Sequence, residues 1–295
     1  MRGRSKRIER LRANVLRALA ESEEKVLSTS QVFYLLVSAG ALANAKNVRR
    51  NFARLLVMMR REGLVPYSRI VDRTRGMHLR ASWGGVVDIM EAAAIQYRRN
   101  LWIDQPTIPI IVCEKQALEG VMESAADVYG ARVFIIRGYD SEANVSLLAD
   151  EIQDLRNEGR DVAIYYFGDW DPSGLNIEAS HRERLRRDFG IVCQWKRAAL
   201  LAEDFDRFGL IPVPVKRGDP RAKRFLIQFA DGRAAELDSL KPAELRRRVA
   251  ECIERHITDR KSWEALERVE AAERASLDLV VKNWDAAVAG AKAAG

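Results

Sequence analysis

The stretch Asp169-Trp170-Asp171-Pro172-Ser173-Gly174 decides how this sequence is interpreted. It follows an apolar run at residues 162–167 that predicts a buried strand, and it precedes a helical pattern at residues 175–189. Two carboxylates therefore stand where a strand ends and a helix begins, which is the edge at which open α/β sheets bind ligands. Neighbouring carboxylates repel each other unless a cation or a proton lies between them, so Asp169 and Asp171 suggest a hard metal ion such as Mg²⁺.

A third acid, Glu114, occupies an equivalent place just after another apolar run. The expected elements are, in order, strand 108–113, helix 116–129, strand 132–136, helix 141–156, strand 162–167, helix 175–189 and strand 191–195. This alternation predicts an α/β fold with a parallel sheet, helices on both faces and right-handed crossovers. Because strand ends in such a sheet converge, Glu114, Asp169 and Asp171 can share one metal site.

The strand spacing, the upstream Glu and the Asp-x-Asp-Pro-x-Gly form resemble the Toprim domain of topoisomerases, primases and related nucleases over residues 108–195. The sequence looks most like the A subunit of topoisomerase VI and its relative, the meiotic double-strand-break protein. In that family the lone Glu and both acids of Asp-x-Asp hold Mg²⁺ for DNA strand cleavage. The resemblance implies these catalytic and metal-binding roles for Glu114, Asp169 and Asp171.

Each acid also has a plainer interpretation. Asp171 before Pro172 is typical of an N-cap followed by a first-turn proline. Asp169 fits a solvated loop acid, and Glu114 fits a residue that favours a helix N-terminus through the helix dipole. The occurrence of all three acids in this order favours the metal site.

Composition favours a cytoplasmic protein that binds nucleic acid. The 295 residues are 47% hydrophobic and leave room for two or three domains. No membrane span or secretory signal is indicated, and three scattered cysteines suggest reduced thiols. The formal net charge of +7 divides into +11 for residues 1–107 and −4 for the rest. Such a concentrated positive region suits DNA, although an ordinary solvated surface would have the same charge.

The N-terminal third is expected to form an α-rich, winged-helix DNA-binding domain. Helices are predicted at residues 4–20, 29–39 (with a capping box at Ser28-Thr29-Ser30-Gln31) and 48–62, and a small wing at 64–70 and 76–79. Arginines on the third helix and in the wing are the candidate DNA contacts, although Asp72 could instead pair with the wing arginines. They are Arg49, Arg50, Arg54, Arg73 and Arg75.

Tyr34 lies off the apolar face of the second helix, on the side of Ser30. Its context resembles that of the nucleophilic tyrosine of the topoisomerase VI family, which implies that Tyr34 attacks a phosphodiester with help from Mg²⁺. That family has an Arg four residues before the tyrosine, where this chain has Ser30. Arg49, Arg60 and Arg75 are the candidates to replace that Arg, and the plainer interpretation of Tyr34 is a half-buried helix residue.

The expected domains are residues 1–105, the winged helix, and residues 106–295, the Toprim domain with a C-terminal hairpin and a helical extension. The hairpin is predicted from residues 224–230 and 233–237 around Asp231-Gly232, and the extension begins at Pro242. Glu236 and Asp238 are expected at the surface, with orientation of the metal site as the alternative.

The sequence therefore predicts Mg²⁺-dependent DNA cleavage with Tyr34 as the nucleophile. The resemblance implies a homodimer in which each site pairs the Tyr34 of one protomer with the metal of the other. The lack of a Gly-x-x-x-x-Gly-Lys-Ser/Thr loop implies that any ATPase would be a separate subunit. Two alternatives remain: a hydrolytic Toprim nuclease, and a non-catalytic DNA-binding factor with a Toprim fold.

Overall fold

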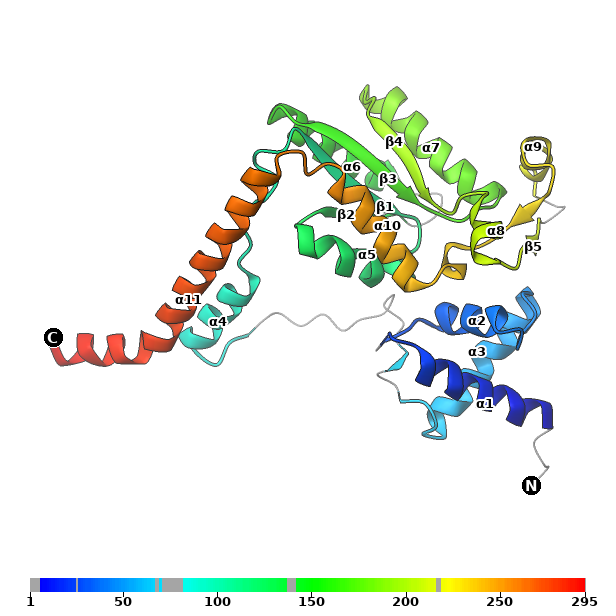
Figure 1. Cartoon of the computed structure of the whole chain (residues 1–295), viewed down its shortest axis with the longest axis horizontal. Helices are drawn as coiled ribbons and strands as arrows, with labels where there is room; N and C mark the ends of the chain where they lie inside the picture. The colour runs from blue at the N-terminus through cyan, green and yellow to red at the C-terminus, as the bar shows by residue number, and fades with distance from the viewer. Residues whose placement is uncertain are drawn as a thin grey trace.

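The structure, a computed structural model, describes residues 6–24, 26–66, 69–70, 82–136, 142–215 and 219–294, without the side chains of 61, 142–144 and 285–294. It is an α/β protein in which helices flank a four-stranded parallel sheet (Figure 1). The strands are β1 (Thr107–Cys113), β2 (Arg132–Ile135), β3 (Asp161–Phe167) and β4 (Gln194–Ala199). The α/β class and the parallel sheet predicted from the sequence are therefore confirmed.

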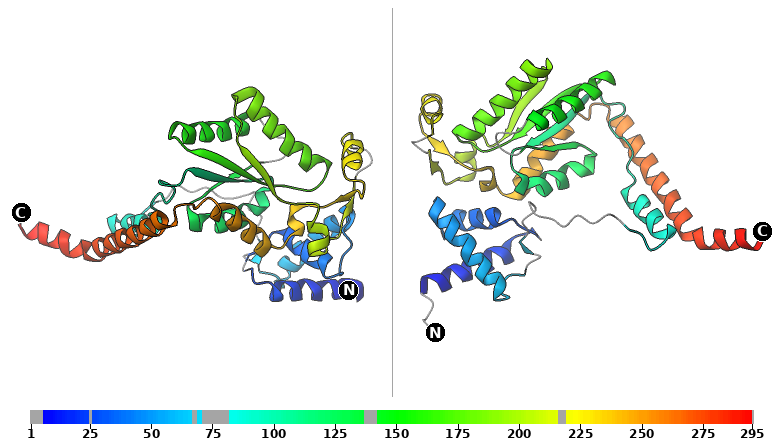
Figure 2. Two further views of the ribbon diagram at one scale, coloured as in Figure 1. Left: turned by 45° about the horizontal axis from the view of Figure 1, so that its top comes forward. Right: turned by 180° about the vertical axis from the view of Figure 1, so that it is seen from behind.

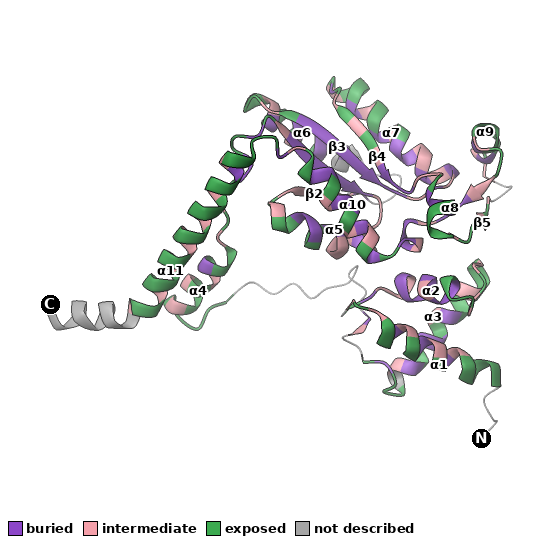
Figure 3. Ribbon diagram, in the orientation of Figure 1, coloured by how far each residue is buried: buried purple, intermediate pink, exposed green. Residues whose placement is uncertain are grey.

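The strand order β2-β1-β3-β4 places the two most apolar strands, β1 and β3, at the centre of the sheet. Their β-branched and aromatic side chains are buried on both faces, as parallel strands covered by helices require (Figure 3). The register pairs Cys113 with Phe167, the last residue of each strand. Glu114 and the segment leading to Asp169 therefore leave the sheet at the same edge.

Helices cover both faces of this sheet (Figures 1 and 2). One face carries α6 (Glu142–Asn157) and α7 (Pro172–Phe189), which pack against each other. The other face carries α5 (Glu119–Ala126) and α10 (Pro242–Glu254). Two short 3₁₀ turns, η2 (Gln116–Leu118) and η3 (Asp127–Tyr129), flank α5. The site at the strand ends is thus built on a packed three-layer core.

The N-terminal region consists of α1 (Lys6–Glu21), α2 (Thr29–Ser38) and α3 (Lys46–Arg61) around its own apolar core. The predicted capping box is present, because the Ser28 side chain accepts from Gln31 N and the Gln31 side chain accepts from Ser28 N. The first half of the expected wing contributes one isolated bridge between Leu27 and Ile70. Residues 71–81, with the second half of the wing, lie outside the described residues.

Helix α4 (Val86–Gln96) packs along α11 (Arg260–Ala294), and the two helices extend together away from the sheet (Figure 1). The Tyr97 hydroxyl donates to Glu273 at 2.6 Å, and the rings of Trp102 and Trp263 meet edge to face. Within the part of the chain that the structure describes, no helix is long and apolar enough to span a membrane.

Two expectations downstream of the sheet are wrong. The hairpin predicted around Asp231-Gly232 is replaced by helix α9 (Ala222–Gln228), and β6 (Arg233–Ala234) pairs with β5 (Val213–Pro214). Phe225 and Phe229, four residues apart, pack against each other, and Phe229 also packs on Trp170, which favours a helical turn. The fourth strand begins three residues later than predicted and ends at Ala199. The sequence pattern at residues 196–208 predicts a helix, but only α8 (Asp204–Phe208) forms there, because β4 occupies the first part of that range.

Candidate active site at the carboxyl edge of the sheet

Glu114 is fixed directly after β1 by its neighbours on β3. Its backbone N–H donates to Phe167 O at 2.9 Å, and its Oε2 accepts from the Tyr166 hydroxyl at 3.1 Å and from Asp169 N at 3.3 Å. Burial, and then the charge of Asp169, raise the pKa of Glu114 to about 7. The structure therefore brings Glu114 and Asp169 together, as the parallel register predicts.

Asp169 lies after β3 and is held from two sides. Its Oδ1 accepts from Leu237 N at 2.7 Å and lies 3.2 Å from Lys115 Nζ. Burial raises the pKa of Asp169, and the ammonium of Lys115 opposes that rise. Asp169 is therefore a constrained, partly desolvated carboxylate and not a solvated loop acid.

Lys115 is the centre of an ion-pair network that sequence reasoning missed. Its Nζ lies 2.9 Å from Glu236 Oε2, 3.0 Å from Asp238 Oδ2 and 3.2 Å from Asp169 Oδ1, and its side chain is only 17% exposed. Burial alone would lower the pKa of Lys115, but the surrounding carboxylates, Asp169 foremost, raise it well above its ordinary value. Lys115 is thus a permanent internal cation at this edge of the sheet.

Glu236 and Asp238 belong to the site, and the expectation that both lie at the surface is wrong for Asp238. Glu236 directly precedes the short turn η4 (Leu237–Ser239), which covers the sheet edge, and Asp238 is the middle residue of that turn. Asp238 is 3% exposed, and its Oδ1 is buried without a hydrogen-bond partner among the described residues. Burial alone would raise the pKa of Glu236, but Lys115 and Arg49 lower it to about 2. We call Glu114, Asp169, Glu236 and Asp238 the acidic cluster.

Asp171 caps α7. Its backbone is extended, and its Oδ1 accepts from Gly174 N at 2.6 Å, with Pro172 at the first helical position. The plainer interpretation of Asp171 is therefore correct as far as the helix is concerned, and its role as a metal ligand stays a prediction. Gly174 is required because a Cβ there would overlap the carbonyl oxygen of Asp169.

The donor set fits a divalent cation in part. Within the described ranges no group of three or more His, Cys, Asp or Glu side chains is positioned to hold a metal ion. Lys115 forms ion pairs with three of the carboxylates. The acidic cluster nevertheless has two more negative charges than Lys115 and Arg49 offset when all four acids are ionised. The pKa of Glu114 is raised first by burial and then by the charge of Asp169. Hard oxygen donors and uncompensated charge are what Mg²⁺ requires.

Tyr34 is buried against this site from the N-terminal region. Helix α2 packs on η4, and Tyr34 is only 4% exposed, so it is more buried than the half-buried residue of the plainer interpretation. Burial, followed by the charge of Glu236, raises the pKa of Tyr34, while Lys115 and Arg49 oppose the rise. The phenol therefore lies within the electrostatic reach of the acidic cluster of its own chain.

Arg49 lies beside Tyr34, and it is one of the three arginines that the sequence offered as a replacement for the Arg of the resembled family. Its guanidinium carbon lies 5.7 Å from the centroid of the Tyr34 ring, and its Nη1 donates to both carboxylate oxygens of Glu236 at 2.5 and 2.6 Å. Its Nη2 donates to Ser30 Oγ at 2.6 Å. The resembled family has an arginine at the position of Ser30. Here Arg49, from the neighbouring helix α3, places its guanidinium beside Ser30.

The remaining arginine candidates lie elsewhere. Arg50 and Arg54 are exposed on α3, as expected of DNA contacts, and Arg60 donates to Ile70 O at 3.0 Å. Arg73 and Arg75 lie outside the described residues.

Comparison with protein-family models, with curated proteins and with solved structures finds no match.

Proposed function

We propose that this chain is a Mg²⁺-dependent DNA-cleaving enzyme, built as a Toprim domain with a winged-helix DNA-binding region and resembling the A subunit of topoisomerase VI. The observation that carries the proposal is the contact between α2 and η4, which joins Tyr34 to the acidic cluster. Two regions that the sequence singled out independently, one for a nucleophile and one for a metal, are in contact through these elements. The basic N-terminal third supports DNA as the substrate.

In this proposal Glu114 and Asp169 hold the ion, and Asp171 contributes from the start of α7. A bound Mg²⁺ supplies Lewis-acid stabilisation of the charge that develops on the phosphate. Arg49 is available to stabilise the same charge, because its guanidinium already lies over the ring of Tyr34. The ammonium of Lys115 reduces the repulsion among the carboxylates of the acidic cluster when neither DNA nor metal is bound.

Tyr34 is the proposed nucleophile. Its phenol oxygen forms a bond to phosphorus while the bond from phosphorus to the 3′-oxygen of the neighbouring nucleotide breaks. The phenol gives up its proton, and the departing 3′-oxygen takes one up, so the DNA 5′ end stays attached to the protein as a phosphotyrosine ester. Because Tyr34 is only 4% exposed, attack requires α2 and η4 to separate enough to admit DNA. A homodimer and a separate ATPase subunit belong to the proposal through the resemblance alone.

A hydrolytic nuclease is the second candidate function, and the burial of Tyr34 favours it. Water would then be the nucleophile, and Tyr34 would only pack against η4. The metal-binding roles of Glu114 and Asp169 are the same in both candidates.

The test is cleavage of supercoiled plasmid by the purified chain with Mg²⁺, compared with EDTA. Asp169→Asn is expected to abolish nicking and linearisation, whereas the matched control Asp154→Asn, on the exposed side of α6, is expected to cleave like the wild type. Retained cleavage in Asp169→Asn would exclude the proposed site. DNA binding that does not respond to Mg²⁺ or to Asp169→Asn, without cleavage, would identify a non-catalytic binding factor.

A further inference from the structure

A cavity of about 470 Å³ lies between α7 and α9, beside the loop that carries Asp169. One face of α7 forms one wall, and α9 with the residues around it forms the other. Its lining includes Arg182, Arg197, Arg221, Arg224, Phe229 and Glu178. The volume is that of a site for a ligand of about one nucleotide.

The lining of this cavity is strongly basic. Four arginines face one acid, Glu178, which Arg197 already neutralises through an ion pair of 2.6 Å. Arg221 pairs with Asp219 at 2.8 Å. Within the described part of the chain, neither Arg182 nor Arg224 forms an ion pair, and both side chains are exposed at the cavity. The cavity therefore presents uncompensated positive charge to a ligand.

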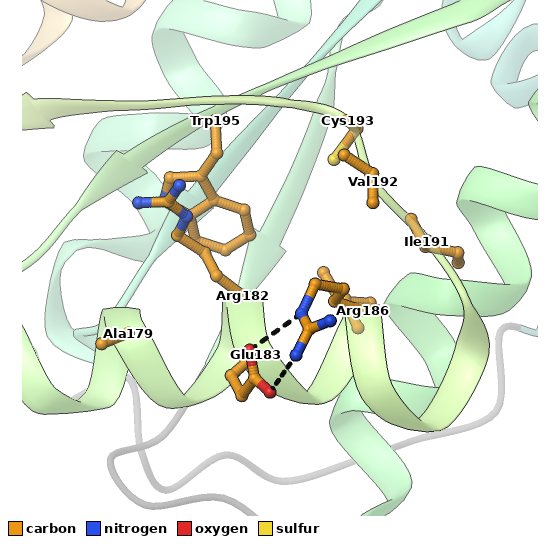
Figure 4. Close-up of a pocket in the computed structure, with 9 residues that line it drawn as sticks. Ala179, Arg182, Glu183, Arg186, Ile191, Val192, Cys193 and Trp195 are labelled. Carbon is orange, nitrogen blue, oxygen red and sulfur yellow. Dashed lines mark hydrogen bonds and ion pairs between the residues drawn. The ribbon is translucent and has the colours of Figure 1, made fainter.

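A second, shallower hollow of about 280 Å³ adjoins this cavity along α7 and shares Ala179 and Arg182 with it (Figure 4). In that hollow Arg186 is held by Glu183, through bonds of 2.6 and 3.0 Å, whereas Arg182 is drawn with no such partner (Figure 4). The free arginine thus stands where the two hollows meet.

Arg197 connects the cavity to the loop of Asp169. Its side chain is 10% exposed, and its Nη1 donates to the carbonyl oxygens of Gly168 at 3.0 Å, Asp169 at 3.2 Å and Leu200 at 3.3 Å. Its Nη2 is buried and has no hydrogen-bond partner among the described residues. An unpaired buried donor in a native fold is a position at which a bound anion or water can be the partner.

We propose that this cavity binds one nucleotide of a DNA strand next to the acidic cluster. Arg182 and Arg224 bind the phosphate, because planar guanidinium groups match the geometry of phosphate oxygens. Phe229, which is partly exposed, gives the base a surface on which to stack. The choice of a DNA nucleotide, and not free phosphate, rests on the proposed function. The cavity would then hold the strand while the acidic cluster acts on a neighbouring phosphodiester.

The experiment is titration calorimetry of the full chain with dTMP in EDTA, which removes any dependence on cleavage. Wild type is expected to bind dTMP, to bind inorganic phosphate more weakly and to leave thymidine unbound. Arg182→Gln and Arg224→Gln are each expected to weaken dTMP binding about tenfold, a loss of about 1.4 kcal/mol. Arg187→Gln removes the same charge from an exposed position on α7 outside the cavity, and its affinity is expected to match that of the wild type.

Absence of dTMP binding, equal binding by all variants, or equal binding of thymidine would each overturn the proposal. Equal affinity for dTMP and inorganic phosphate would overturn the proposal that the cavity recognises a nucleotide, and would identify a site for free phosphate. Circular dichroism and the melting temperature establish that each variant is folded. Because the titration contains no metal, loss of dTMP binding is separable from a failure of plasmid cleavage, and dTMP binding without cleavage would refute only the proposed function.

Discussion

Replacing Lys115 by methionine is the perturbation that most directly probes how the acidic cluster is held together. The substitution keeps most of the side-chain volume and removes the ammonium that lies 2.9 to 3.2 Å from Glu236, Asp238 and Asp169. The three carboxylates are then left facing one another at the edge of the sheet, and Asp238 is buried.

The magnitude follows from this geometry. Two unit charges about 3 Å apart attract by about 5–6 kcal/mol at an effective dielectric constant of about 20, and the cost of desolvating the ions offsets much of that attraction. Removing one member of a buried ion pair costs about 3–5 kcal/mol, because the remaining charge stays buried. At about 2–4 °C per kcal/mol, Lys115→Met is expected to lower the melting temperature by about 6–20 °C.

The assay is thermal unfolding of the full chain, followed by circular dichroism at pH 7.5 and at pH 5.5. The loss is expected to shrink at pH 5.5, because carboxylates without their counter-ion take up protons more readily. The control is Lys223→Met, which removes an exposed lysine, and its melting temperature is expected to stay within about 2 °C of wild type. If Lys115→Met behaves like Lys223→Met, the account of the internal cation is refuted.

Two further predictions concern the elements that support the site. Gly174→Ala is expected to destabilise the fold by about 1–3 kcal/mol in urea unfolding, because its Cβ would overlap the carbonyl oxygen of Asp169, and an unchanged unfolding midpoint would contradict the close approach. Hydrogen bonds from Arg247 and Arg248 lower the pKa of Glu244 to about 2 from an ordinary value of 4.5. A depressed acid pKa stabilises the fold above pH 4.5, and this contribution is lost as the pH falls toward 2. Glu244→Gln should therefore be about 1–2 kcal/mol less stable than wild type at pH 7 and nearly equal to it near pH 2, and a pH-independent difference would contradict this assignment.

The sequence predicted the sheet and one pair of acids well, for a physical reason. Strands β1 and β3 are continuous apolar runs that only a parallel sheet covered on both faces can bury. Parallel register then brings Glu114 and Asp169 to the same edge, whatever the rest of the chain does. The N-cap role of Asp171 could also be predicted from the sequence, because its signal is the adjacent Pro172.

The rest of the site could not be predicted, because it is made by contacts between distant segments. A lysine directly after a strand is expected at the surface. Lys115 is buried because Glu236 and Asp238, more than a hundred residues later in the chain, lie against it. Arg49 was named both as a DNA contact and as one of three candidates to replace the missing Arg near Tyr34. The sequence could not choose among the three, because the bond from Arg49 to Glu236 depends on how α3 meets the second region. The hairpin prediction failed because Asp231-Gly232 is a strong turn signal, whereas the packing of Phe229 on Trp170 is invisible in sequence.

The most direct test of the central claim is detection of a covalent protein–DNA intermediate. Plasmid is incubated with the chain and Mg²⁺, stopped with detergent, and divided into samples with and without protease before electrophoresis. The account predicts DNA ends that migrate normally only after protease, a DNA adduct on the peptide that contains Tyr34, and loss of both in Tyr34→Phe but not in the matched control Tyr129→Phe. Free ends that need no protease and survive in Tyr34→Phe would contradict the tyrosine mechanism and identify a hydrolytic nuclease.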